Sequence, residues 1–291
     1  MKTPPNVCVL VAQHGIGDHY NVAGFAEAVA KRHKFKVWLA GRRELAWVSD
    51  LFPAVERYIH WPDHMRAESI LTHRPMAGCY YFAHFPRMDL AHAVGFKDFH
   101  FLDAYRVRLF LRPEAELSEA RLPNPEELAR ARSFLQQHDC PLGRTVILNI
   151  DARTTALGGV DPRYWPLLAA AFRTQGVEPF VNQGPWTQIS DGLRGAPFNV
   201  ADYRAIAMVA GAVCTVRSGI SDLVSNLPIP QVVVYPDADY LGGPLIKGTT
   251  LTKFGLAVPP LEILARKGNV QQDVRAISQH LESSLAAAAA A

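Results

Sequence analysis

Hydrophobic and polar positions along the first part of the chain alternate between short apolar runs and segments with apolar residues at helical spacing. Residues 7–12 form a continuous apolar run bounded by proline and glycine, which is typical of a strand buried on both faces. The pattern predicts strands at 7–12, 35–40 and 55–60, with helices at 23–33 and 44–51. Three such strand–helix units in about sixty residues predict a doubly wound parallel sheet.

The second half of the chain repeats this rhythm after a proline-rich break at 112–125, which we interpret as a linker. Between the two parts, 63–113 is less regular, with a candidate strand at 79–85 and a mixed pattern at 102–111. Further on, strands are expected at 145–150, 177–181, 213–216 and 231–235, and helices at 126–138, 164–174, within 199–210, at 221–226 and through 261–285. The sequence therefore predicts an α/β protein with two βα-repeat domains, at 1–122 and 123–285, followed by an alanine tail at 286–291.

Composition and charge narrow the classes of partner. Hydrophobic residues make up 49% and charged residues 20% of the 291 residues, which is enough for a sizeable core. A net charge of +3 fits an anionic small ligand, and it is compatible with a peripheral contact with the inner membrane. The basic runs at 31–34 and 106–112 are short and are typical of solvated helix ends or strand flanks, so we expect no nucleic-acid partner.

Cysteine and histidine spacing argues against a metal site. The four cysteines lack the Cys-x-x-Cys spacing of zinc sites, and the histidines form neither His-x-His nor His-Glu-x-x-His.

Scattered cysteines within apolar runs are typical of a reducing compartment. The apolar run at 7–12 is too short for a signal peptide, and no stretch reaches the ~18–20 apolar residues of a membrane span. We therefore expect a cytoplasmic protein without a metal.

The segment from His14 to Asp18 follows the first expected strand, where parallel sheets bind their ligands. Gly15 and Gly17 permit a tight turn and a close approach to backbone amides. The segment lacks the third glycine of a dinucleotide fingerprint and the Gly-Lys-Ser/Thr of a Walker loop. Because a carboxylate would repel a pyrophosphate, Asp18 suits a general base toward an acceptor hydroxyl; the alternative is that Asp18 only caps the helix.

A second candidate segment, Arg217-Ser218-Gly219, follows the expected strand at 213–216 and opens a helix. The positive end of the helix dipole, a guanidinium and a hydroxyl together suit a diphosphate. An arginine at the end of a buried strand is costly unless it is paired or meets a ligand. Two interpretations follow: Arg217 binds a diphosphate, or it forms a structural ion pair with a neighbouring acid such as Asp222.

Three further polar residues lie in loops of the second half. Arg153 follows the expected strand at 145–150, and Arg163 stands at the start of the next helix. Either side chain could reach a phosphate, and either could be a solvated surface residue. Gln183 follows the strand at 177–181 and is a candidate contact to a base or ribose. No Gly-x-Ser-x-Gly elbow is present, so serine hydrolase chemistry has no support.

Together these loops resemble the GT-B glycosyltransferases, most closely the bacterial ADP-heptose:lipopolysaccharide heptosyltransferases. The resemblance rests on residues 15–18, 36–40, 51–59 and 163–166, the last being similar to the family's basic-x-Trp-Pro segment. It implies two Rossmann-like domains facing a cleft, with Asp18 as the base and Arg163 near the donor phosphates. The family's Asp-Ser/Thr-Gly-x-x-His motif lies over 217–222; here arginine replaces the leading aspartate and aspartate replaces the histidine, which leaves the nucleotide and the sugar open.

The sequence therefore predicts an inverting sugar transferase. Its partners would be a nucleotide-sugar donor, used as substrate, and a glycan or glycolipid acceptor, with no separate cofactor. The expected donor-binding residues are Arg153, Arg163, Gln183, Arg217, Ser218, Gly219 and Asp222; the acceptor loop contains His14, Gly15 and Gly17, with Asp18 as the catalytic base. Two alternatives stay open: a non-catalytic nucleotide- or sugar-binding module, and another GT-B-like enzyme such as a polysaccharide pyruvyl transferase or a nucleotide-sugar epimerase.

Overall fold

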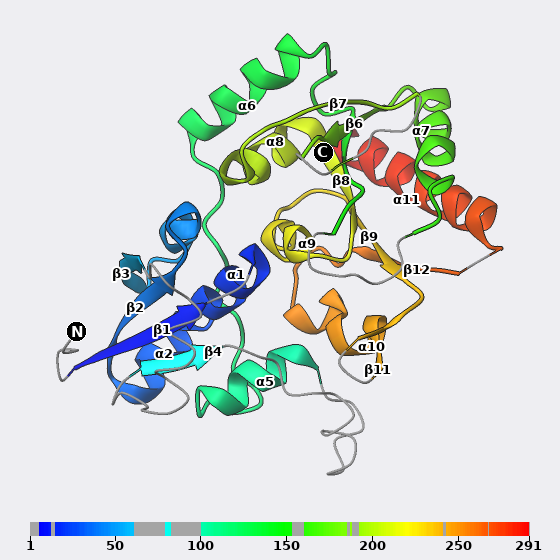
Figure 1. Cartoon of the computed structure of the whole chain (residues 1–291). Helices are drawn as coiled ribbons and strands as arrows, with labels where there is room; N and C mark the ends of the chain where they lie inside the picture. The colour runs from blue at the N-terminus through cyan, green and yellow to red at the C-terminus, as the bar shows by residue number, and fades with distance from the viewer. Residues whose placement is uncertain are drawn as a thin grey trace.

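The first half of the chain forms a four-stranded parallel sheet (Figure 1). The computed structural model describes residues 6–12, 15–60, 79–82, 100–152, 160–184, 187, 192–240, 243–266 and 268–290. The sheet has the order β3-β2-β1-β4, and its strands are β1 (Val7–Ala12), β2 (Lys36–Gly41), β3 (Val55–His60) and β4 (Cys79–Phe82). All six residues of β1 are buried, as expected for a central strand covered on both faces.

The second half forms a six-stranded sheet in the order β12-β9-β8-β5-β6-β7, with every neighbouring pair parallel. Its strands are β5 (Thr145–Asn149), β6 (Glu178–Asn182), β7 (Arg194–Ala196), β8 (Gly211–Val216), β9 (Gln231–Pro236) and β12 (Leu261–Ala265). The chain builds outward from β5 to β7, then returns to the other side of β5 and builds outward again. This is the doubly wound Rossmann order, which confirms the predicted fold class.

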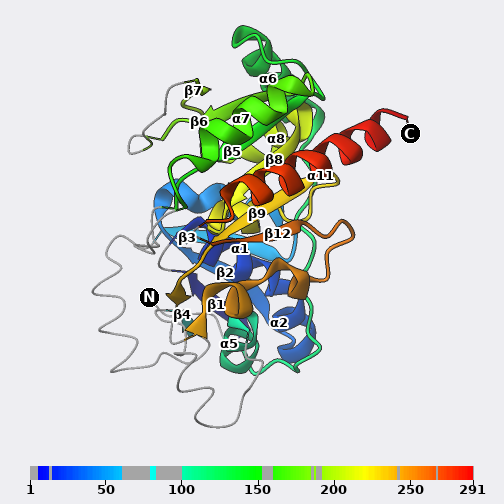
Figure 2. The ribbon, with the colours of Figure 1, turned by 90° about the vertical axis from the view of Figure 1, so that its right-hand side faces the viewer.

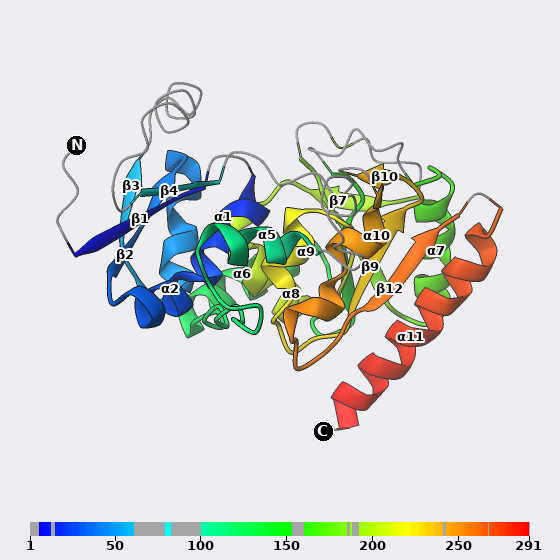
Figure 3. The ribbon, with the colours of Figure 1, turned by 90° about the horizontal axis from the view of Figure 1, so that it is seen from below.

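Helices pack on both faces of the sheets and between them (Figures 2 and 3). The long α11 lies with α7 on one face of the second sheet, α8 lies on the other face, and α1 packs against α9 between the halves. The helical elements are α1 (Ile16–Gly24), α2 (Ala26–His33), η1 (Arg43–Leu51), α5 (Phe101–Arg108), α6 (Pro125–Gln137), α7 (Tyr164–Thr174), η2 (Val200–Asp202), α8 (Tyr203–Ala210), α9 (Gly219–Val224), α10 (Leu245–Thr249), η3 (Leu251–Phe254) and α11 (Val270–Ala290). A short ribbon joins β10 (Asp239–Tyr240) and β11 (Gly243–Pro244). None of the helices in the described ranges is long and apolar enough to span a bilayer.

The hydrophobic core continues from one half into the other. One cluster of buried side chains includes Phe25 and Tyr105 from the first half together with Tyr203 and Leu223 from the second. A second cluster lies on the opposite face of the six-stranded sheet, where Trp165 of α7 contributes to the packing beneath α11. The two sheets are therefore held together by shared apolar packing and not only by the connecting chain.

Two sequence-based expectations about local structure are wrong. The first helix begins at Ile16 rather than at residue 23, because α1 buries polar residues such as His19 and Asn21 together with apolar ones, so an apolar pattern does not mark its start. Residues 261–265 form β12 rather than helix, because this short apolar run pairs with the edge strand β9. The mixed segment at 102–111 contains helix α5. The division at residue 122 stays a prediction.

Candidate functional site

Both candidate segments lie at the switch points of their sheets. In the first sheet the chain leaves β1 for β2 on one side and later adds β4 on the other, so the end of β1 borders the switch point. In the second sheet the neighbours at the switch point are β5 and β8. Ligands of open parallel sheets bind outside the carboxyl ends of such strands. Gly15 to Asp18 follow β1, and Arg217 to Gly219 follow β8, so the topology places both segments where ligands are expected.

Two glycines bring the first turns of α1 and α9 into direct contact. A Cβ atom added at Gly219 would lie 2.5 Å from the backbone nitrogen of Gly17. One added at Gly17 would lie 2.8 Å from Cα of Gly219 and 2.7 Å from a carboxylate oxygen of Asp222. The sequence analysis attributed these glycines to a close approach by a ligand. The close approach that the structure shows is between the two helices themselves.

The Asp18 carboxylate is held at both oxygens. The backbone N–H of Gly15 donates to Oδ2 at 2.9 Å, so Asp18 caps the start of α1. The hydroxyl of Tyr105, on α5, donates to Oδ1 at 3.1 Å. Asp18 therefore caps α1, and Tyr105 on helix α5 also orients its carboxylate. Asp18 remains half-buried, so its position is compatible with a general base but does not by itself demonstrate one.

Tyr105 is a site residue that the sequence analysis missed, since 87 positions separate it from Asp18. Its ring is buried against Phe25 and Phe101. Burial, and then the charge of Asp18, raise the pKa of the Tyr105 phenol well above its ordinary value. The phenol therefore stays protonated and serves as a hydrogen-bond donor to Asp18.

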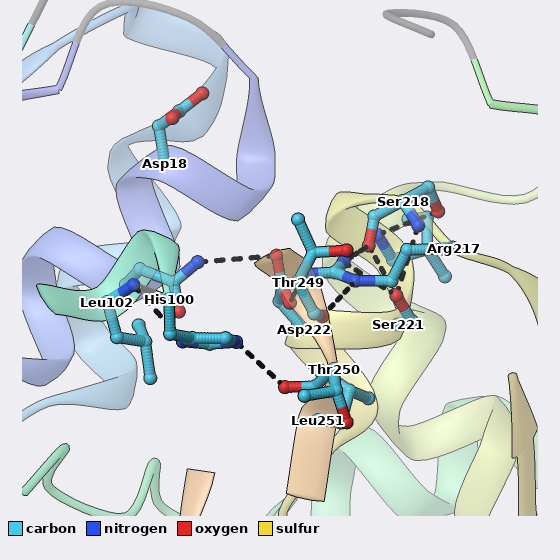
Figure 4. Close-up of polar contacts among 12 residues, drawn as sticks. Asp18, His100, Leu102, Arg217, Ser218, Ser221, Asp222, Thr249, Thr250 and Leu251 are labelled. Carbon is cyan, nitrogen blue, oxygen red and sulfur yellow. Dashed lines mark hydrogen bonds and ion pairs between the residues drawn. The ribbon is translucent and has the colours of Figure 1, made fainter. Parts of the chain in front are cut away.

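The Arg217 guanidinium is buried and satisfied by protein groups (Figure 4). Its Nε donates to the carbonyl of Thr249 at 2.9 Å, and its terminal nitrogens donate to the Ser218 carbonyl at 2.8 Å and to Ser221 Oγ at 3.0 Å. An ion pair of 2.9 Å joins it to Asp222. The structure thus shows the ion pair of the second interpretation of Arg217, and a contact between its guanidinium and a diphosphate stays a prediction.

Asp222 connects this ion pair to the first half of the chain. Its carboxylate is buried, and Asn21 on α1 donates to Oδ2 at 3.3 Å. Burial raises the pKa of Asp222, and the neighbouring guanidinium offsets part of that effect. Arg217 also lies over the ring of Phe101, 5.5 Å from the ring centre. The charged pair therefore fastens α9 to elements of both halves, and a donor contact by Asp222 stays a prediction.

His100 is a second residue that the sequence analysis did not assign to this region. It is fully buried at the start of α5: its Nε2 donates to the Thr250 carbonyl at 2.9 Å, and its Nδ1 accepts from Leu102 N at 3.2 Å. Burial lowers the pKa of His100 to about 3, although the bond to Thr250 opposes the change. A neutral imidazole thus joins the two halves beside Arg217 (Figure 4).

The remaining predicted site residues are dispersed. Arg163 is exposed and forms an ion pair of 2.6 Å with Asp161, while Gln183 is exposed just after β6. The Ser218 hydroxyl caps α9 by accepting from Ile220 N at 3.3 Å. His14 and Arg153 lie outside the described residues. Within the described ranges, no group of three or more His, Cys, Asp or Glu side chains could hold a metal ion.

Comparison with known proteins identifies the fold. No protein family and no curated protein sequence matches the chain. A glycosyl transferase family 9 structure from Veillonella parvula DSM 2008 is similar over 98% of this chain and 99% of its own, with a TM-score of 0.67 and 14% identity. The fold is GT-B. An ADP-heptose LPS heptosyltransferase II from E. coli shares this GT-B fold over 98% of both chains, with a TM-score of 0.68 and 11% identity. An E. coli heptosyltransferase with ADP-2-deoxy-2-fluoro heptose is similar over 95% of this chain and 99% of its own, with a TM-score of 0.55 and 14% identity.

Proposed function

We propose that this GT-B protein is an inverting glycosyltransferase that moves a sugar from a nucleotide-sugar to a hydroxyl of a bacterial surface glycan or glycolipid. The observation that carries the proposal is the position of Asp18 at the switch point of the first sheet, with both carboxylate oxygens oriented. The similar structures support it, since they are heptosyltransferases and a family 9 glycosyl transferase. One of them holds an ADP-sugar analogue, which makes ADP the first nucleotide to test.

The proposed reaction is a single displacement. Asp18 takes the proton of the acceptor hydroxyl as the oxygen attacks the anomeric carbon from the face opposite the diphosphate. The bond between that carbon and the diphosphate oxygen breaks, and the nucleoside diphosphate leaves with the electron pair. Tyr105 and the Gly15 amide hold the carboxylate so that its orientation does not have to be established during the reaction.

On the donor side we propose that Ser218 and Gly219 contact the diphosphate, with Arg163 and Arg153 as sources of positive charge. Cations aimed at the leaving diphosphate would stabilise its developing charge without a metal. Gln183 is proposed to contact the base or ribose. Arg217 has an indirect part in this proposal, because its guanidinium bonds to the Ser218 carbonyl and so fixes the loop at the start of α9.

Binding and turnover together test the proposal. We expect ADP, or another nucleoside diphosphate, to raise the melting temperature, and the matching nucleotide-sugar to be consumed when a lipopolysaccharide-type acceptor is present. Asp18→Asn should keep the thermal shift and lower turnover by about 10²–10⁴-fold, the usual contribution of a general base. Asp139→Asn, at an exposed position with the same chemical change, is the matched control.

The alternative with specific structural support is the non-catalytic module. The buried Arg217–Asp222 pair occupies the two positions at which the sequence departs from the family motif. A thermal shift with nucleoside diphosphates, but no turnover by the unaltered protein with any nucleotide-sugar of the panel, would favour this alternative. Near-normal turnover by Asp18→Asn would instead remove Asp18 as the base while leaving the transferase activity in place.

A further inference from the structure

Helices α1 and α9, which begin at the two candidate segments, pack against each other between the halves (Figure 1). The close approach of Gly17 and Gly219 joins their first turns, and the hydrogen bond from Asn21 to Asp222 joins the turns that follow. Since these contacts advance along both helices together, α1 and α9 run in the same direction. The register of this helix pair therefore sets where Asp18 lies relative to the loop that opens α9.

Arg204, on α8, fixes the other end of the helix pair. It is only 2% exposed, and its guanidinium donates to the Leu223 carbonyl in the last turn of α9 and to Asn226 Oδ1 at 2.7 Å. The same amide oxygen accepts a hydrogen bond of 3.1 Å from the Tyr20 hydroxyl on α1. The two helices therefore meet at one amide group, and Arg204 orients that group.

The chain segment that connects the halves is bonded to the same two side chains. Arg204 donates from a terminal nitrogen to the Arg121 carbonyl at 2.9 Å, and Asn226 Nδ2 donates to the Ala120 carbonyl at 2.7 Å. Toward the first half, the backbone N–H of Arg121 donates to the Leu51 carbonyl at 2.8 Å. Because the connecting segment is bonded to both halves at this point, rotation of one half against the other would break several hydrogen bonds.

The shape of an arginine side chain suits this position. Among the described residues the hydrogen-bond acceptors of Arg204 are all neutral: two carbonyl oxygens and one amide oxygen. A buried cation with neutral partners is costly unless its donors are used, so charge pairing does not explain this residue. A planar guanidinium carries five donors in fixed directions and can bond to α9 and to the connecting segment at once. A lysine would keep the charge without this geometry.

We infer that Arg204 is a positioning residue that fixes the loop at 217–219 relative to Asp18 before any ligand binds. A fixed arrangement brings the base and the donor site together without an ordering step during the reaction. The expected effect on turnover rests on the proposed function. The fixed arrangement of the halves does not, because it can be measured without a substrate.

Distance measurements on the full chain, without ligand, test the inference. Spin labels attached through non-natural amino acids at exposed positions 32 and 275, one in each half, should give a single narrow distance distribution. Arg204→Met should broaden this distribution, because α9 and the connecting segment lose their common donor. Arg130→Met, the same chemical change at an exposed position on α6, is the matched control and should leave the distribution unchanged.

Turnover distinguishes positioning from a purely structural role. Arg204→Met should lower kcat about 10–100-fold, because small displacements of reacting groups have effects of this size. The thermal shift with nucleoside diphosphate should be retained, since the proposed donor contacts lie within the second half. Arg204→Lys should recover only part of the lost turnover. Tyr20→Phe removes one donor to Asn226 and keeps the buried ring, so it is the milder variant should Arg204→Met fail to fold.

Three results would overturn the inference. The first is two populated distances in the unaltered protein, which would show that the halves open freely. The second is a distance distribution that stays narrow in both Arg204→Met and Tyr20→Phe. The third is a lower melting temperature in Arg204→Met with an unchanged distribution and unchanged kcat, which would make Arg204 a purely structural residue. A lack of turnover by the unaltered protein would instead contradict the proposed function, and the distance measurements would still decide the inference.

Discussion

The charged residues in the loops at the two switch points differ in their burial and in their partners. Each follows a buried parallel strand, each opens a helix that a side chain caps, and each contains a glycine at the contact between the halves. In the first loop the charged group, Asp18, is half-buried, and the hydrogen bonds described for it come from neutral donors. In the second loop Arg217 and Asp222 are buried and neutralise each other.

The difference shows that loop position does not determine the role of a charged residue. A half-buried carboxylate that accepts neutral hydrogen bonds can still take a proton from a bound molecule. A buried cation beside a buried anion is committed to structure, because removing either partner leaves the other charge unpaired in a dry environment. The first loop is therefore the better candidate for chemistry, and the second is the better candidate for holding the halves together.

The largest expected effect comes from breaking the buried ion pair. Asp222→Asn leaves the Arg217 cation without its counter-charge and should lower the free energy of unfolding by about 3–5 kcal/mol, measured by urea denaturation. The double variant Arg217→Met/Asp222→Leu should lose less than this single change, since it leaves no unpaired charge. Asp161→Asn, which breaks the exposed pair with Arg163, should have little measurable effect. If Asp222→Asn were as harmless as Asp161→Asn, the pair would not be structural.

The contact between α1 and α9 gives the next effect. Gly219→Ala places a Cβ 2.5 Å from the Gly17 backbone and should cost about 1–3 kcal/mol of unfolding free energy as the helices separate. Gly15→Ala is the matched control, because a Cβ there meets no atom within 4 Å and the residue has an ordinary negative φ of −89°. Equal stabilities of the two variants would contradict the tight helix contact.

His100 should make the contact between the halves sensitive to acid. Its pKa is about 3 in the folded protein and near 6.5 when exposed, so the unfolded chain binds the additional proton between these values. Stability therefore falls as the pH drops through 6.5 toward 3, and His100 alone should account for about 2 kcal/mol lost between pH 7 and pH 5. His100→Asn, which retains a helix-capping side chain, should lose less stability over this range in parallel urea titrations. Identical pH dependence of the two proteins would exclude His100 as the cause.

Tyr105→Phe should have the smallest effect and the most specific one. The variant loses the hydroxyl that donates to Asp18 but keeps the buried ring, so stability should fall by about 1 kcal/mol or less. If Asp18 is the base, kcat should decrease about five- to ten-fold while the thermal shift with nucleoside diphosphate is unchanged. Tyr203→Phe is the control, since the buried Tyr203 hydroxyl makes no hydrogen bond with described residues. A loss of nucleotide binding in Tyr105→Phe would place Tyr105 on the donor side instead.

The sequence was sufficient for the inner strands of both sheets, because these are short apolar runs separated by polar turns, but it missed the edge strands β7 and β12. It was insufficient for the start of α1, which lies between the two halves and buries the polar residues His19 and Asn21. It placed Asp18 and Arg217 at the correct strand ends and offered the nearby Asp222 as a partner of Arg217, but it could not assign the distant partners. Tyr105 and Thr249 lie far from them along the chain, and only the packing of α5 and α10 brings these residues into contact.

The core that runs through both halves has a consequence for how the protein unfolds. Phe25 and Tyr105 share one apolar cluster with Tyr203 and Leu223, so separating the halves exposes hydrophobic surface on both sides. Two domains coupled in this way lose their independence and should melt as a single cooperative unit, with one calorimetric peak. A fragment that ends before α6 would carry an uncovered apolar face and should aggregate when expressed alone.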